Sequence, residues 1–115
     1  MITILTVSKM GEIVRQSMRG DYFEIPQDLY ERLAEVLREA KSEYCHSNDR
    51  MLAKEKYDRI ETAATQLFEA RLHLMFRRYH SPGEDRFYTP EERDYMKSLD
   101  KFAFDFRFIV MEAYQ

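Results

Sequence analysis

The side chains that could bind a metal or act as nucleophiles are few in this sequence. Cys45 is the single cysteine and His46 follows it directly, but no further partner stands at the spacing of a zinc site. A di-iron site in a helical bundle needs Glu-x-x-His motifs, and Glu69 and His73 miss that spacing by one residue. The three glycines lie too far apart for a phosphate-binding loop. We therefore predict no catalytic residue, no cofactor and no metal.

Carboxylates are plentiful, and four of them recur every four residues. The series is Glu31, Glu35, Glu39 and Glu43. This spacing places them along one side of a helix, where Arg32 and Arg38 could offset part of their charge. The pattern is typical of a solvated helix face. It gives no support to an acid–base pair, so we do not expect an enzyme.

Basic side chains gather toward the end of a long helical pattern. Arg71, Arg77 and Arg78 stand there with His73 and His80. Positive charge near a helix C-terminus complements the helix dipole, which is the simpler interpretation. The alternative is a contact patch for an acidic partner or for DNA phosphates, which Arg86 and Arg93 would extend. By its spacing from Leu67 and Phe68, Arg71 is the most inward of the three arginines. We predict an interface role for Arg71 and a solvated role for Arg77 and Arg78.

Helices must position these side chains, because the composition is that of a helical protein. Of 115 residues, 44% are hydrophobic and 34% charged, with three glycines and three prolines. The length predicts a single helical domain over residues 1–115. A formal net charge of -3 argues against a general affinity for nucleic-acid phosphates. With one cysteine and no membrane-spanning apolar run, we expect a soluble intracellular chain without a membrane partner.

Helix-end signals and apolar spacing divide the first two-thirds of the chain into three helices. The first should begin after Thr6 or Ser8 and end near Arg19, before Gly20. Its expected buried face is Val7, Met10, Val14 and Met18. The second should start at Gln27, directly after Pro26, and reach about His46. The third should span about residues 50–79 after a cap within Ser-Asn-Asp at 47–49.

A fourth helix is expected to begin at the Thr-Pro-Glu-Glu sequence at 89–92. Thr89 would be the N-cap, Pro90 the first helical residue, and Glu92 would close a capping box. The short loop before it should turn the chain, so that the last two helices form a long antiparallel pair. The predicted fold class is all-α, a four-helix bundle-like domain.

The fourth helix carries more apolar surface than the rest of the chain could cover. Large exposed apolar patches usually mark interfaces, so we predict oligomerisation through the last helices. The predicted interface residues are Leu67, Phe68, Arg71, Phe102, Phe106, Ile109, Val110 and Ala113.

Three segments, taken in order, resemble the helical domain of a GINS subunit. They are IPQDLYERLAEVL at 25–37, LFEARLHLMF at 67–76 and YTPEERDYMKSL at 88–99. The chain is most similar to archaeal-like subunits of the type in which the helical domain comes first. In that type a β-rich domain normally follows the fourth helix, so the resemblance implies a longer protein with such a domain after residue 115.

The resemblance implies a scaffold rather than an enzyme. GINS is a tetramer that joins the MCM helicase to the Cdc-forty-five or RecJ-like protein at the DNA replication fork. The expected partners are other GINS subunits or further copies of this chain, the MCM helicase and the RecJ-like protein, with at most a weak DNA contact. The expected location is the archaeal cytoplasm, at the nucleoid, or the eukaryotic nucleus. The alternative that the residues themselves leave open is a stand-alone helical adaptor or regulator that binds a partner helix.

Overall fold

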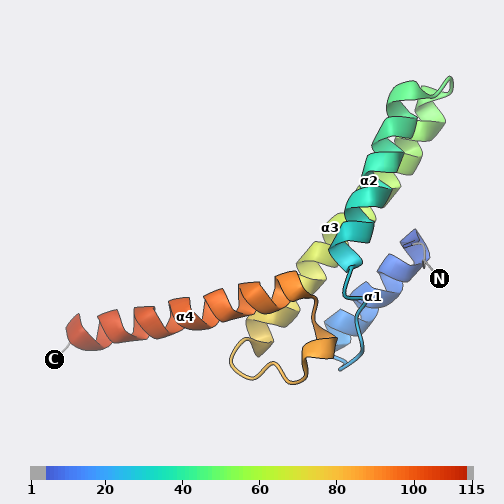
Figure 1. Cartoon of the computed structure of the whole chain (residues 1–115). Helices are drawn as coiled ribbons and strands as arrows, with labels where there is room; N and C mark the ends of the chain where they lie inside the picture. Colours follow the sequence, from blue (N-terminus) through green and yellow to red (C-terminus); the bar gives the residue numbers. More distant parts are fainter. Residues whose placement is uncertain (1–4, 114–115) are drawn as a thin grey trace.

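The computed structural model describes residues 5–113, and within this range the chain is all-helical with no strand. The four α-helices are α1 (Val7–Arg19), α2 (Leu29–His46), α3 (Arg50–Arg78) and α4 (Pro90–Ala113), with a short 3-10 helix η1 (Asp85–Phe87) before α4. The predicted all-α fold class is confirmed. Figure 1 shows α2 and α3 as a hairpin, α1 beside the second half of α3, and α4 leading away from this body.

Local sequence signals explain most of the helix ends. The Thr6 hydroxyl accepts a hydrogen bond from the Lys9 amide at 3.1 Å, and Asp49 caps α3 in the same way through the Leu52 amide. Gly20 ends α1 in the left-handed region, at a φ of 78°, as predicted. The start of α2 differs from the prediction: Gln27 and Asp28 lie in a turn, and the helix begins only at Leu29.

The core lies where α1 and α2 pack on opposite parts of α3. Its largest members come from all three helices and include Met10, Ile13, Leu29, Leu33, Leu67 and Leu74. The predicted buried face of α1 was partly wrong. Met10 is buried, but Val7 and Met18 are exposed, and Ile13 and Ser17 are buried in their place. The buried face is therefore rotated from the predicted one, and it includes Ser17, whose hydroxyl accepts a hydrogen bond from Arg71.

The structure does not confirm a long antiparallel pair of C-terminal helices. In α4 only Glu92 and Met96 are buried, and both lie in its first two turns. The rest of the helix projects away from α3 (Figure 1). No helix within residues 5–113 is long and apolar enough to cross a membrane.

Candidate interaction site and the polar cluster at its base

A buried ion pair joins α3 to the first turn of α4. Arg71 donates from Nε to Glu92 Oε2 and from Nη2 to Glu92 Oε1, both at 2.7 Å. The exposed fractions of the two side chains are 0% and 1%. A bidentate pair of this kind is among the strongest polar contacts in proteins, provided that every remaining donor and acceptor is also satisfied.

The Glu92 carboxylate meets that condition, since each of its oxygens accepts two hydrogen bonds. The Tyr30 hydroxyl donates to Oε2 at 2.7 Å, and the Thr89 amide donates to Oε1 at 2.9 Å. The Glu92 amide in turn donates to the Thr89 hydroxyl at 3.1 Å, so the predicted capping box is present. The capping carboxylate is therefore also the counter-ion of Arg71.

The other donors of Arg71 connect two more elements. Nη1 donates to the Ser17 hydroxyl of α1 at 3.2 Å, and Nη2 donates to the Phe87 carbonyl of η1 at 2.9 Å. No buried side-chain nitrogen or oxygen in the described part of the chain lacks a partner. We call Ser17, Tyr30, Arg71, Thr89 and Glu92 the polar cluster. It links all four helices and sets the direction in which α4 leaves the body.

Tyr30 has a strongly perturbed acidity because of its place in this cluster. Burial raises the pKa of its hydroxyl far above the ordinary value of 10.0, and the negative charge of Glu92 raises this pKa further. Tyr30 therefore stays a neutral hydrogen-bond donor at any physiological pH. Its ring also stacks on Phe68, with the centroids 5.7 Å apart.

Beyond the cluster, α4 forms an arm with apolar side chains on most of its surface. We use the name arm for residues 101–113. Phe102 is 70% exposed and Phe106 is 60% exposed, and the remaining large apolar side chains of the arm are also exposed. This further set is Phe104, Phe108, Ile109, Val110 and Met111. No other described segment of the chain carries such a dense exposed group of aromatic residues.

The predicted interface residues fall into two groups in the structure. Leu67 and Arg71 have no exposed surface, because they lie in the core and in the polar cluster. Phe68 is about half exposed and lines up with Leu72 and Phe76 at four-residue spacing on an exposed side of α3. The remaining residues, Phe102, Phe106, Ile109, Val110 and Ala113, all lie exposed on the arm.

The prediction of a solvated role was wrong for Arg78. Its guanidinium donates to the Gly20 carbonyl at the end of α1 and lies over the Tyr22 ring, 4.0 Å from the ring centroid. Arg77 is exposed, and its guanidinium donates a 3.5 Å hydrogen bond to the Ser17 carbonyl. Both arginines therefore lie against the C-terminal end of α1, whose carbonyls favour positive charge.

The regular glutamate series on α2 is exposed, as predicted. The basic partners of this series are not the expected Arg32 and Arg38, however. Arg32 pairs with Asp28 at 2.7 Å, and Glu43 pairs with Lys56 of α3 at 3.0 Å. Cys45 and His46 are exposed, and within residues 5–113 no three His, Cys, Asp or Glu side chains are grouped to hold a metal ion.

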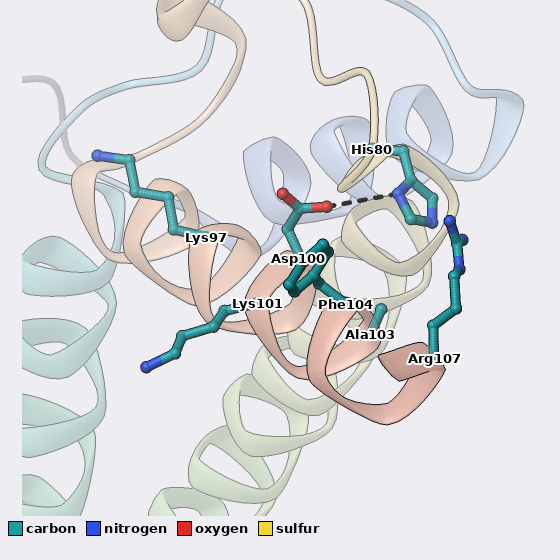
Figure 2. Close-up of a pocket in the computed structure, with 7 residues that line it drawn as sticks. All are labelled: His80, Lys97, Asp100, Lys101, Ala103, Phe104 and Arg107. Carbon is teal, nitrogen blue, oxygen red and sulfur yellow. Dashed lines mark ion pairs between the residues drawn. The ribbon is translucent and has the colours of Figure 1, made fainter. Parts of the chain in front are cut away.

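A shallow hollow lies where the end of α3 meets α4 (Figure 2). Its volume is about 550 Å³, and its lining residues are His80, Lys97, Asp100, Lys101, Ala103, Phe104 and Arg107. In Figure 2 the two lysines lie on one side of Asp100 and Phe104, and His80 and Arg107 lie on the other. His80 Nδ1 is 3.4 Å from the Asp100 carboxylate.

Sequence reasoning missed the partnership of Arg71 with Glu92 and the hollow in Figure 2. The first left a usable signal: an arginine on an apolar helix face must find a buried counter-ion, and Glu92 is fixed at a helix start. The hollow left part of a signal: Lys97, Lys101 and Arg107 all belong to the fourth helix, and only His80 joins them through the angle between α3 and α4.

Comparisons with family models, with curated proteins and with solved structures find no match for this chain. The class that the fold and the surface define is therefore a broad one. The protein is an all-helical body with a polar cluster at its centre and an apolar helical arm that leaves it.

Proposed function

We propose that this protein is a non-catalytic scaffold of the GINS type, which self-associates through the arm and links partner proteins at the replication fork. The proposal rests on the three sequence segments that resemble GINS helical domains. The arm is the structural observation that carries it. The exposed stripe of Phe68, Leu72 and Phe76 on α3 adds a second apolar surface for assembly.

The arm supports a scaffold because its apolar side chains are not used by the chain itself. Phe102, Phe106, Ile109 and Val110 recur at three- and four-residue spacing and so share one side of α4. Exposing such a side to water costs free energy that a partner surface recovers on binding. A second copy is the simplest partner, because it brings an identical apolar side.

Light scattering during gel filtration tests the self-association. At micromolar concentration the chain should elute as a dimer or tetramer, and Phe106→Glu should convert it to a 14.0 kDa monomer. Met51→Glu is the matched control, since Met51 is also highly exposed but lies at the start of α3, far from the arm along the chain. A monomeric unmodified chain, or equal effects of both variants, would argue against the proposal.

Co-purification separates the GINS-type scaffold from the alternative of a stand-alone adaptor. A GINS-type subunit should retain the MCM helicase and the RecJ-like protein from an extract of its own organism. An unrelated adaptor would keep an apolar arm for a partner helix, but it would retain neither protein. The Phe106→Glu variant serves as the control for capture through the arm alone.

A further inference from the structure

We propose that the hollow between the end of α3 and α4 binds an acidic segment of a partner protein, one that also carries apolar side chains. This inference goes beyond the proposed scaffold by naming the chemistry of a ligand and its place on the molecule. It does not require self-association, so the two proposals fail independently.

The first argument is unpaired positive charge. The side chains of Lys97, Lys101 and Arg107 make no hydrogen bond and no ion pair with any described residue. The protein as a whole carries a formal net charge of -3, so these three cations form a local exception. All three are exposed, and Lys97 and Lys101 stand one helical turn apart, so their charges can act together on an incoming carboxylate.

The second argument concerns the acidic side chain in the hollow. Asp100 is the only carboxylate among the lining residues, and it faces His80 at 3.4 Å. The two lysines point away from this pair, and Arg107 lies on the far side of it (Figure 2). Asp100 therefore leaves the amines of Lys97 and Lys101 available to an incoming carboxylate.

The third argument is the aromatic side chain between the cations. Phe104 is 68% exposed and lies three residues from both Lys101 and Arg107, so its ring lies between these two cations on α4 (Figure 2). A ligand with carboxylates alone would leave this ring in water. A ligand with carboxylates flanking a leucine or phenylalanine would pair the charges and cover the ring together.

A peptide fits this surface better than a nucleic acid does. Strong phosphate binding needs a run of cations, whereas Asp94, Asp100 and Asp105 interrupt the positive charges of α4. Stacking of successive bases needs several aromatic faces, and the lining residues of the hollow include only Phe104. Nucleic acid is therefore an alternative outcome of the test.

The hollow and the apolar side of the arm can be occupied together. Successive helical residues are rotated by about 100°, so Phe104 and Phe106 lie about 160° apart, on nearly opposite sides of α4. Self-association through Phe106 therefore leaves Phe104 and the lysines open to a ligand.

Fluorescence anisotropy with a labelled peptide tests the inference. The probe is a 12-residue peptide of glutamates interrupted by three leucines, and its comparator has glutamine at every glutamate position. The full chain should bind the glutamate peptide, with an affinity that falls as salt rises, and should bind the comparator at least tenfold more weakly. Lys97→Gln/Lys101→Gln and Phe104→Asn should each weaken binding of the glutamate peptide at least fivefold.

The matched control is Lys41→Gln/Lys54→Gln, which removes the same charge from exposed lysines of α2 and α3. It should leave the affinity for the glutamate peptide within twofold of the original. Equal loss in both double variants, or equal binding of the two peptides, would overturn the inference. Tighter, lysine-dependent binding of a 20-residue oligothymidylate would replace the acidic peptide with nucleic acid. Light scattering of Lys97→Gln/Lys101→Gln should still report the original oligomer, which separates this result from a failure of the proposed scaffold.

Discussion

At the scale of single residues, Glu92 combines two tasks that are usually separate. It closes the capping box of α4, and its carboxylate neutralises the buried guanidinium of Arg71. Either task alone would tolerate a mobile side chain. Together they fix the first turn of α4 to α3, and Tyr30 and Ser17 tie that turn to α2 and α1.

Removing one member of the buried ion pair should lower the stability of the protein far more than removing one member of a surface ion pair. Arg71→Met should lower the free energy of unfolding by about 3 to 5 kcal/mol, because Glu92 would remain buried without its counter-ion. Urea denaturation followed by circular dichroism measures this change. The surface pair Lys56 and Glu43 provides the control, and Lys56→Met should cost no more than about 1 kcal/mol.

The double variant Arg71→Met/Glu92→Gln tests whether Arg71 and Glu92 stabilise the protein as one unit. Once the positive charge is gone, neutralising Glu92 should recover part of the lost stability, so the two effects should not add. Additive losses would contradict the assignment of Arg71 and Glu92 as one unit.

Tyr30 should make stability fall at high pH. Its pKa is raised in the folded protein, mainly by burial and then by the charge of Glu92, while in the unfolded chain it is about 10. The full contribution of Tyr30 to the free energy of unfolding is therefore present below pH 10. It is lost progressively above pH 10, where the phenol can ionise in the unfolded chain. The free energy of unfolding should decrease from about pH 10 upward.

Tyr30→Phe isolates this effect. It should cost about 1.5 to 3 kcal/mol at neutral pH, the usual value of a hydrogen bond to a charged group, and make the loss above pH 10 shallower. Part of the slope should remain, because burial also raises the pKa of Tyr88 and the charge of Glu61 raises that of Tyr57. An unchanged slope would show that Tyr30 is not the titrating group.

At the scale of the helices, Gly11 inside α1 and Gly20 directly after it provide opposite predictions. Gly20 has a φ of 78°, so Gly20→Ala should cost about 1 kcal/mol by forcing a side chain into the left-handed region. Gly11 lies inside α1, where a new Cβ would be 3.5 Å from the Arg15 guanidinium, an ordinary contact. Gly11→Ala should therefore stabilise the protein by about 0.5 to 1 kcal/mol. Thermal unfolding of both variants checks the pair, and a shift of the same sign in both would contradict it.

Helix ends were predictable from the sequence where one residue decides them. Gly20 and Thr89 mark helix ends at the predicted residues, Thr6 is one of the two predicted N-caps of α1, and Asp49 lies within the predicted capping stretch 47–49. The buried face of α1 was less predictable. Ser17 turns inward for Arg71, which is 54 residues away, so no local pattern contains that information.

In the candidate site too, features set by neighbouring residues were predictable from the sequence, and features set by distant residues were not. The inward position of Arg71 and the capping role of Glu92 were each predictable from nearby residues. The direction of α4 was not, because its apolar spacing fits a helix packed along α3 as well as a helix that projects from it. That direction decides both the exposure of the arm and the formation of the hollow in Figure 2.

At the scale of the whole molecule, the chain is too extended for a self-sufficient domain. Its radius of gyration is 18.0 Å and its extents are 67 × 31 × 22 Å, whereas a compact domain of this length has a radius of about 13 Å. The arm accounts for much of the difference, since the structure covers α4 only over its first two turns. Its apolar residues add nothing to the core of the same chain.

Removal of the arm should therefore leave the body folded, and the unfolding temperature should no longer depend on protein concentration. A chain ending at Lys101 keeps Glu92, Met96 and the polar cluster, so its helical body should unfold cooperatively at one temperature at any concentration. If the arm binds a second copy, the unfolding temperature of the complete chain should rise by about 2 to 4 °C for each tenfold increase in concentration, because association stabilises only the folded state. Differential scanning calorimetry at protein concentrations from about 5 to about 500 μM, a range of about two orders of magnitude, resolves such a shift.

A truncated chain that fails to fold would mean that the arm belongs to the core. A complete chain whose unfolding temperature ignores concentration would mean that the arm meets a different protein.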